Sequence, residues 1–273
     1  MGLPYSFCRF LPSQSESGDE RGAMKISATI ITFNEERNIA RVIESLRCCD
    51  EILVLDSGSN DRTAEIATKL GARVVEASWN GYAAQKNIAA ELATHDWILA
   101  LDADESLSEA LEAEIWHIKK SGPRFDGYTV PRLAQYLGRW ILHSGWHPDR
   151  KVRLFDRKKA KWVGTFVHES VKVEGSVGHL RSNLLHFTCN SLSEHVRSMD
   201  RYTTLAAQEI VSLGRQPSLA RVLFDPLWTF FRTYVLRLGF LDGTEGLIIA
   251  YMAAFYNFVK YSKARHMSPG RKT

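Results

Sequence analysis

Short apolar runs rich in β-branched residues alternate with amphipathic segments over the first half of the chain. The runs are apolar throughout, which is typical of strands buried on both faces of a sheet. The predicted strands are 26–32, 51–56, 72–77 and 96–102, and the predicted helices are 36–47, 62–70, 82–93 and 106–119. This alternation predicts an α/β fold, a mostly parallel Rossmann-like sheet with helices on both faces.

The pattern changes after Pro131. The stretch 132–170 has weak periodicity and is rich in Arg, His and Trp, so we expect a loop-rich lid over a substrate. Strand-like pieces occur at 151–156, 171–174 and 182–187.

Helical periodicity dominates the remainder, over 192–213, 218–238 and 244–262. In the second of these segments aromatic and aliphatic side chains recur at helical spacing, and three arginines interrupt the other faces. The longest clean apolar run, 247–255, is much shorter than the roughly 20 residues needed to span a bilayer. Two interpretations stay open: the helices lie in the lipid headgroup region, or they form a cap packed on the sheet.

Charge is distributed unevenly along the chain. The 273 residues are 45% hydrophobic and 24% charged, which excludes fibrous and wholly disordered classes and allows one large or two small domains. Residues 1–136 hold 14 basic and 21 acidic residues (net −7), whereas 137–273 hold 21 and 10 (net +11). The second half is therefore expected to face an anionic partner.

The first 23 residues are polar and contain no signal-peptide core, so 1–23 is expected to be a disordered prefix, with Met24 as the natural start. The four cysteines form neither a zinc pattern nor a disulfide framework, which favours a reducing cytosol.

Polar residues follow three of the predicted strands at their carboxyl ends, where ligands bind in sheets of this kind. Asp102 and Asp104 form a D-x-D pattern on one side of an extended segment, and carboxylates are the ligands that Mg²⁺ and Mn²⁺ prefer. The alternative is that these acids only cap the next helix. Asp56 offers hydrogen-bond acceptors to a base or ribose, whereas Asp61 is expected only to cap a helix.

Two common nucleotide signatures are missing from the sequence. No G-x-G-x-x-G follows the first strand, and G-x-x-x-x-G-K-[ST] does not occur. A dinucleotide dehydrogenase and a P-loop phosphotransferase are therefore disfavoured.

Four motifs in this order resemble the nucleotide-binding half of family 2 inverting glycosyltransferases, which have the GT-A fold: TIITFNEE (29–36), VLDSGSNDRT (54–63), QKN (85–87) and ALDADE (100–105). Three later motifs are similar to the β-glucosyltransferase branch of lipopolysaccharide core biosynthesis: RLFDR (153–157), VGTFVHESV (163–171) and GFLDGTEGL (239–247). The resemblance implies a GT-A catalytic domain over 24–190, with a nucleotide-binding half (24–130) and an acceptor half with the lid (131–190). A helical membrane-proximal extension over 191–273 follows.

The resemblance also implies roles for individual residues. Nucleotide contacts fall on Thr32, Asn34, Glu35, Asp56, Lys86 and Asp102, with Asp56 at the uracil or ribose and Lys86 at the diphosphate. The metal contacts fall on Asp104, directly, and on Asp102, which would contact ribose or metal-bound water. The family more often carries two acidic residues where this chain has Asp56 and Ser57.

An inverting transferase needs one general base on the side of the sugar opposite the metal. Glu169, beside His168 at the far end of the lid, is our first candidate, with Asp156 and Asp149 in reserve. The alternative is that His168 and Glu169 form a surface pair.

The acceptor is expected to meet basic residues of the lid. Arg150 and Arg153, with Lys151 and His168 nearby, could bind a phosphate or carboxylate of the acceptor, although a solvated basic loop is equally consistent with the pattern.

These observations predict a transferase dependent on Mg²⁺ or Mn²⁺ that moves a hexose, with glucose favoured, from a UDP-sugar to an anionic glycolipid such as the lipopolysaccharide core. It would work in the cytoplasm at the inner membrane surface. The alternatives are a sugar nucleotidyltransferase, which would need a Gly/Arg-rich phosphate loop, and a non-catalytic membrane-bound scaffold. Nucleic acid is not an expected partner, because the basic residues form no recognised module.

Overall fold

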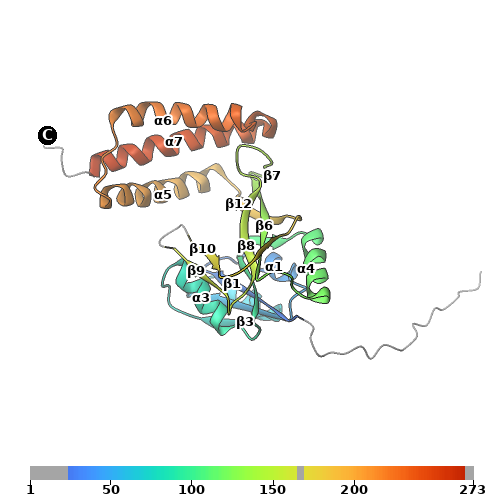
Figure 1. Cartoon of the computed structure of the whole chain (residues 1–273). Helices are drawn as coiled ribbons and strands as arrows, with labels where there is room; N and C mark the ends of the chain where they lie inside the picture. The colour runs from blue at the N-terminus through green and yellow to red at the C-terminus, as the bar shows by residue number, and fades with distance from the viewer. Residues whose placement is uncertain (1–23, 165–168, 268–273) are drawn as a thin grey trace, which may run out of the picture.

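The computed structural model describes residues 24–164 and 169–267. The expected prefix 1–23 and the candidate residue His168 lie outside the described residues. Figure 1 shows an α/β body with a layer of three helices, α5 to α7, beside it.

Four parallel strands form one side of the main sheet, in the order β3-β2-β1-β4. They are β1 (Ile26–Thr32), β2 (Glu51–Asp56), β3 (Arg73–Glu76) and β4 (Trp97–Asp102). The helices between them are α1 (Ile39–Glu44), α2 (Thr63–Lys69) and α3 (Tyr82–Leu92), and α4 (Glu109–Ser121) follows β4. The sequence predicted these elements, except that the start of its fourth helix belongs to a short strand, β5 (Glu105–Leu107).

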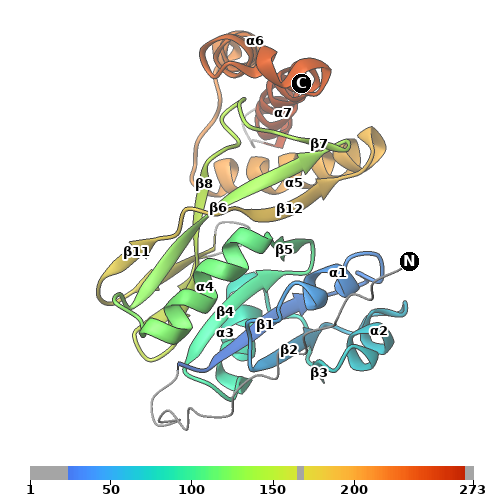
Figure 2. The same cartoon turned by 90° about the vertical axis from the view of Figure 1, so that its right-hand side faces the viewer.

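The helices cover both faces of this sheet, as predicted (Figure 2). One core cluster packs α1, α2 and α4 on one face, with Ile39, Ala67 and Leu111 buried in it. A second cluster packs Ala89 and Ala90 of α3 on the opposite face. Strands buried on both faces explain why the apolar runs are continuous.

The other side of the sheet continues in the order β8-β6-β12-β5, with β8 antiparallel to both of its neighbours. These strands are β6 (Gly127–Tyr136), β8 (Asp149–Asp156) and β12 (Leu184–Cys189). Two short strands, β7 (Arg139–Trp140) and β11 (Val177–His179), pair with β6. A separate two-stranded sheet consists of β9 (Ala160–Val163) and β10 (Ser170–Val173).

The expectation of a loop-rich lid over 132–170 was therefore wrong for most of that stretch. Pro131 lies inside β6, opposite Arg150 of β8, and the pairing shifts register between Tyr128 and Thr129. The strand-like piece predicted at 151–156 is part of β8, whereas the basic side chains of Arg150 and Lys151 at its start hide the full length of the strand.

The chain ends in a helical layer that comprises α5 (Leu192–Ser212), α6 (Leu219–Phe231), a π-helical turn η1 (Arg232–Leu236), a 3-10 turn η2 (Gly239–Asp242) and α7 (Gly243–Met267). Serine side chains cap α5 and α6, because Ser191 and Ser218 accept hydrogen bonds from backbone N–H groups of the first turn. The predicted helix 218–238 is therefore not one α-helix, because α6 ends at Phe231 and the π-helical turn η1 follows it.

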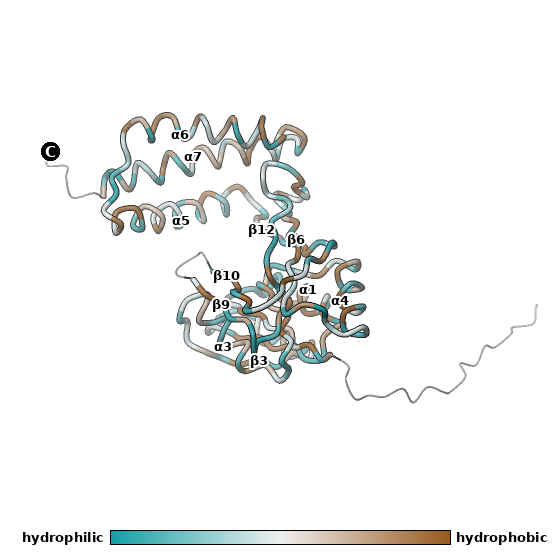
Figure 3. Tube along the Cα trace, in the orientation of Figure 1, coloured by the Kyte–Doolittle hydropathy of each residue, from teal (hydrophilic) through white to brown (hydrophobic). Residues whose placement is uncertain are grey.

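No single described helix is long and apolar enough to cross a membrane, although α6 with η1 and η2 with α7 pass that test as a pair bent by 71°. Apolar residues recur along α6 (Figure 3). Several large ones are exposed, among them Phe224, Leu227 and Trp228 at 65%, 67% and 56%.

The amino edge of the parallel sheet is held together by Glu51. Its carboxylate accepts hydrogen bonds from Ser27 Oγ (2.5 Å), from the backbone N–H of Thr94 (2.6 Å) and from Arg73 Nη2 (2.7 Å). Burial alone raises the pKa of Glu51, but these hydrogen bonds outweigh burial and lower the pKa from 4.5 to about 2.

We expect Glu51 to make stability dependent on pH. Because the pKa is lower in the folded protein, the stabilisation is complete above pH 4.5 and is lost as pH falls toward 2. The shift corresponds to about 3 kcal/mol, so Glu51→Gln should lower the free energy of unfolding at pH 7 by up to that amount and flatten its acid dependence. Urea unfolding at pH 7 and pH 3 measures both, with exposed Glu91→Gln as the control. Equal pH slopes in wild type and Glu51→Gln would contradict the assignment.

Candidate functional site

The carboxyl ends of β1, β2 and β4 lie side by side. Thr32 pairs with Asp56, and Ile31 pairs with Asp102, which confirms the predicted convergence of three strand ends. A cavity of about 1680 Å³ opens at this edge and extends to α5, where Arg201, Tyr202 and Leu205 line it.

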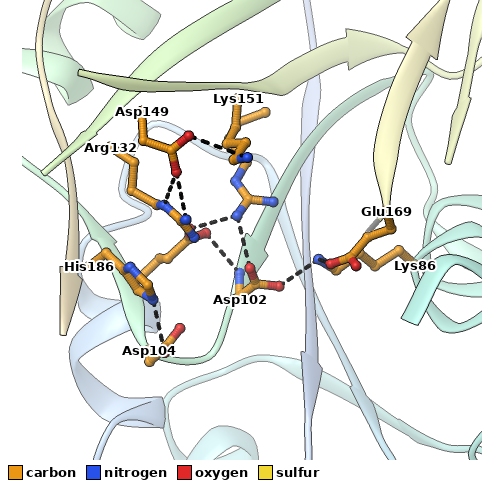
Figure 4. Close-up of polar contacts among 10 residues, drawn as sticks. Lys86, Asp102, Asp104, Arg132, Asp149, Lys151, Glu169 and His186 are labelled. Carbon is orange, nitrogen blue, oxygen red and sulfur yellow. Dashed lines mark hydrogen bonds and ion pairs between the residues drawn. The ribbon is translucent and has the colours of Figure 1, made fainter. Parts of the chain in front are cut away.

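Asp102 lies between two cations at the end of β4 (Figure 4). Its Oδ1 is 2.8 Å from Lys86 Nζ, and its Oδ2 is 2.8 Å from Arg153 Nη2. Burial alone raises the pKa of Asp102, but Arg153 and Lys86 outweigh it and hold the pKa well below its usual range. Each oxygen of the ionised carboxylate thus contacts one cation of the protein, and the metal contact of Asp102 stays a prediction.

Arg153 is a buried residue that also lines the cavity. Its side chain is 4% exposed, and Nη2 also lies 2.6 Å from Glu105 Oε1. Burial lowers the pKa of Arg153, but Glu105 and Asp102 outweigh it and raise the pKa above its ordinary value. Arg153 thus forms ion pairs within the protein, and its role as an acceptor contact stays a prediction. Arg150 fits the expected location better, because it is exposed and lines the cavity, and its guanidinium donates to the carbonyl of Leu180.

Lys86 connects Asp102 with the candidate base. Its side chain is 5% exposed, and Nζ lies 3.1 Å from Glu169 Oε1 and 4.4 Å from the centroid of the Trp162 ring. Glu169 lines the cavity directly before β10. The structure therefore brings the predicted diphosphate contact and the predicted base into one ion pair.

Asp104 pairs with a histidine that sequence reasoning missed. His186 Nε2 lies 3.1 Å from Asp104 Oδ2, and both residues line the cavity. The contact arises because β12 pairs antiparallel with β5, so that His186 lies opposite Glu105. A strand-like run around His186 was visible in the sequence, but its partner strand lies far away along the chain.

The donor chemistry of this pair fits a divalent cation. A carboxylate oxygen and an imidazole nitrogen suit Mn²⁺, and Mg²⁺ commonly takes only one or two protein ligands when phosphate oxygens complete the shell. No cluster of three or more His, Cys, Asp or Glu side chains suited to a metal occurs among residues 24–164 and 169–267. Asp104 and His186 could therefore hold a metal only together with oxygens of a bound ligand.

The remaining nucleotide candidates divide into wall residues and loop residues. Thr32 and Glu35 line the cavity, and burial together with the charge of Asp104 raises the pKa of Glu35. Asn34 has a positive φ of 55°, donates its backbone N–H to Ser59 Oγ and accepts from the N–H of Asn60. Asn34 thus joins the loop after β1 to the loop after β2.

Asp56 also serves its own loop. Its oxygens accept hydrogen bonds from Gly58 N (3.2 Å), Ser59 N (2.8 Å) and Ser59 Oγ (2.5 Å), and it is 4% exposed. The neighbouring Ser57 lines the cavity and accepts a hydrogen bond from Gln85. Ser57 is therefore the second residue that the sequence analysis missed, although the family motif marked its position.

The two reserve bases are not suited to the role. Asp156 pairs with Trp97 at the amino end of β4, so it lies at the opposite edge of the sheet from Asp102. Asp149 lies 2.6 Å from Arg132 and 3.3 Å from Lys151. Burial alone raises the pKa of Asp149, but the two cations lower it below its ordinary value.

Four residues of the cavity wall carry a buried polar atom without a partner among the described residues: Thr32 Oγ1, Arg153 Nε, Trp162 Nε1 and His186 Nδ1. Buried polar atoms are normally paired, so several unpaired atoms around one cavity indicate a site that a polar ligand or water completes.

Among solved structures, S. aureus TarS in complex with UDP-GlcNAc is 16% identical and has a TM-score of 0.46, over 91% of this chain and 93% of that one.

Two curated relatives match nearly the whole chain. The uncharacterized glycosyltransferase RC0292 of Rickettsia conorii is 34% identical over 89% of this chain and 91% of its own length. The lipopolysaccharide core biosynthesis glycosyltransferase LpsC of Rhizobium meliloti is 32% identical over 88% and 92%. The family profile described as "Glycosyl transferase family 2" matches residues 27–171. By these matches the chain belongs to glycosyl transferase family 2 and has the GT-A fold of that family.

Proposed function

We propose that the chain is a metal-dependent inverting glycosyltransferase that moves a hexose from a UDP-sugar to an anionic glycolipid. One observation carries the proposal: Asp102 separates the Lys86–Glu169 pair from the Asp104–His186 pair within one cavity (Figure 4). The cavity thus offers a carboxylate for a proton and a separate donor pair for a cation.

In this proposal the residues divide the chemistry between them. Asp104 and His186 would hold Mg²⁺ or Mn²⁺, which stabilises the negative charge of the departing diphosphate. Glu169 accepts the proton of the acceptor hydroxyl while that oxygen bonds to the anomeric carbon. The bond from the same carbon to the diphosphate breaks, UDP leaves with the electron pair, and attack from the opposite side inverts the configuration.

Lys86 couples donor binding to the base. Its ammonium group is shared between Asp102 and Glu169, and it is almost completely buried. A donor diphosphate would compete with Glu169 for this cation. Donor binding therefore releases a Glu169 oxygen for the acceptor hydroxyl, which favours transfer in the order donor first, acceptor second.

Several residues support the choice of substrates. Thr32, Glu35 and Ser57 line the donor end of the cavity, and we propose them as nucleotide contacts, while Asn34 and Asp56 shape the loops behind them. Exposed Arg150 is proposed to meet an anionic group of the acceptor. The relative LpsC is named for lipopolysaccharide core biosynthesis, which supports that class of acceptor, and UDP-glucose is the donor to test first.

The helical extension is proposed to rest on the cytoplasmic face of the membrane, with 24–190 as the catalytic domain and 191–273 as the extension. Exposed apolar side chains on α6, η1 and η2 lie among arginines, an arrangement that suits an anionic lipid surface. These apolar residues are Leu219, Leu223, Phe224, Leu227, Trp228, Phe231, Val235, Leu236, Leu238, Phe240 and Leu241.

Removal of either proposed metal ligand, Asp104 or His186, should abolish metal-dependent turnover. We expect Asp104→Asn and His186→Gln each to reduce the rate of UDP release about 100-fold or more. Each should also lower the affinity for the metal ion about 10- to 100-fold, because each removes one of two protein ligands. UDP release from a panel of UDP-sugars, titrated with Mg²⁺ and Mn²⁺, measures both effects.

The exposed histidine of α4, His117, supplies the matched control, and His117→Gln should behave as wild type. Unchanged metal dependence in Asp104→Asn would exclude the proposed metal position, and wild-type protein that neither binds nor consumes any UDP-sugar would favour a scaffold.

Glu169→Gln should separate binding from chemistry. The variant keeps the shape of the side chain but cannot accept a proton, so transfer should fall about 10²- to 10⁴-fold while UDP affinity is retained. Exposed Glu174→Gln, after β10 in the same small sheet, is the control. Transfer to a truncated core glycolipid and calorimetric UDP binding are the two measurements, and a variant with near wild-type transfer would remove Glu169 from the mechanism.

A further inference from the structure

A second cavity of about 380 Å³ lies between the loop after β7 and the helical layer. Among the described residues no acidic side chain lines it, whereas two arginines, Arg232 and Arg237, and a histidine, His195, do. Polar and aromatic side chains, among them Trp146, Tyr256 and Asn257, complete much of the wall. The lining is therefore basic and rich in hydrogen-bond donors.

The π-helical turn brings the two arginines together. In a regular α-helix residues five apart point about 140° away from each other around the axis. Here the backbone N–H of Arg237 donates to the carbonyl of Arg232 at 2.8 Å, a bond that closes the wider turn of η1. Within the described residues neither guanidinium forms a hydrogen bond or ion pair. Two guanidinium groups without a protein counter-ion thus line one cavity.

The wall opposite η1 is built to receive Arg237. A Cβ atom on Gly145, whose φ is 77°, would collide with the Arg237 guanidinium, so only glycine allows this approach. The adjoining loop is fixed by Asp242, which accepts hydrogen bonds from the backbone N–H groups of Leu142 and His143 and from Ser144 Oγ. This buried aspartate belongs to the motif GFLDGTEGL, so the motif builds the cavity and not the nucleotide site.

We propose that this cavity binds the phosphate group of a lipid at the membrane surface. A guanidinium group can donate two parallel hydrogen bonds to the oxygens of a phosphate. The adjoining turn exposes Leu236, Leu238 and Phe240 for contact with acyl chains. Tyr256 lines both this cavity and the large one, so the two cavities adjoin at this residue. The further identification of that lipid as the glycosyl acceptor rests on the proposed function.

Vesicle sedimentation and calorimetry test the proposal on the full chain. Vesicles of phosphatidylcholine with one fifth phosphatidic acid supply an accessible lipid phosphate. Vesicles with the same share of phosphatidylglycerol supply an anionic surface whose phosphate is less accessible. Inorganic phosphate alone supplies the soluble anion. We expect the double variant R232Q/R237Q to lose about tenfold or more in affinity for the phosphatidic acid vesicles and for inorganic phosphate, because both bidentate donors are removed.

Exposed Arg215→Gln, on the turn after α5, removes a charge without touching the cavity and should bind as wild type. Equal losses in R215Q and in each single variant, R232Q and R237Q, would reduce the effect to general electrostatics and overturn the proposal. Arginine-dependent binding of inorganic phosphate without arginine-dependent vesicle binding would overturn the lipid assignment. If the double variant R232Q/R237Q fails to fold, the lysine variants R232K and R237K, which retain the positive charge, are measured in its place. Binding requires no UDP-sugar, so an inactive transferase with intact arginine-dependent lipid binding would refute only the proposed function.

Discussion

The ion pairs of Asp102 hold the two halves of the α/β body in one geometry. Lys86 comes from α3, Asp102 from β4 and Arg153 from β8, so the cluster joins the parallel strands to the antiparallel ones. Glu105 closes it, with one oxygen on Arg153 and the other on the backbone N–H of Asp102. Removal of one member of such a buried network leaves an uncompensated charge, at a cost of about 3–5 kcal/mol. The orientation of the cavity wall therefore depends on this charge balance.

The same balance explains what the cavity can bind. Three carboxylates, on Asp102, Glu105 and Glu169, share the three cations Lys86, Arg132 and Arg153. Asp104, paired only with a histidine, adds a further acidic group. The cavity wall carries acidic residues and Lys or Arg residues in equal number, so it offers cations to a diphosphate as well as carboxylates to a divalent cation. In the proposed function a metal would need no third protein ligand, because phosphate oxygens of the sugar donor could complete its coordination shell.

Local sequence carries the fold of the first half but not the pairings that build the site. The strands and helices up to β4 follow from hydrophobic periodicity, and the polar strand ends locate the cavity. The contact between Asp104 and His186 depends on the pairing of β12 with β5, which no local pattern encodes. The burial of Arg153 could not be predicted from the sequence either. It lies on β8 close to Arg150 and Lys151, which are exposed, and no local pattern distinguishes it from them.

The charge asymmetry of the chain also has two origins that composition cannot separate. Four basic residues of the second half, Arg153, Arg157, Lys158 and Lys159, form ion pairs with acids of the first half. This part of the asymmetry is internal and holds the halves together. The arginines on η1 and at its end have no such partner among the described residues and lie beside exposed apolar side chains. The helical layer therefore differs from the rest of the second half, because the same few turns supply both unpaired arginines and exposed apolar side chains, and the lipid proposal rests on this combination.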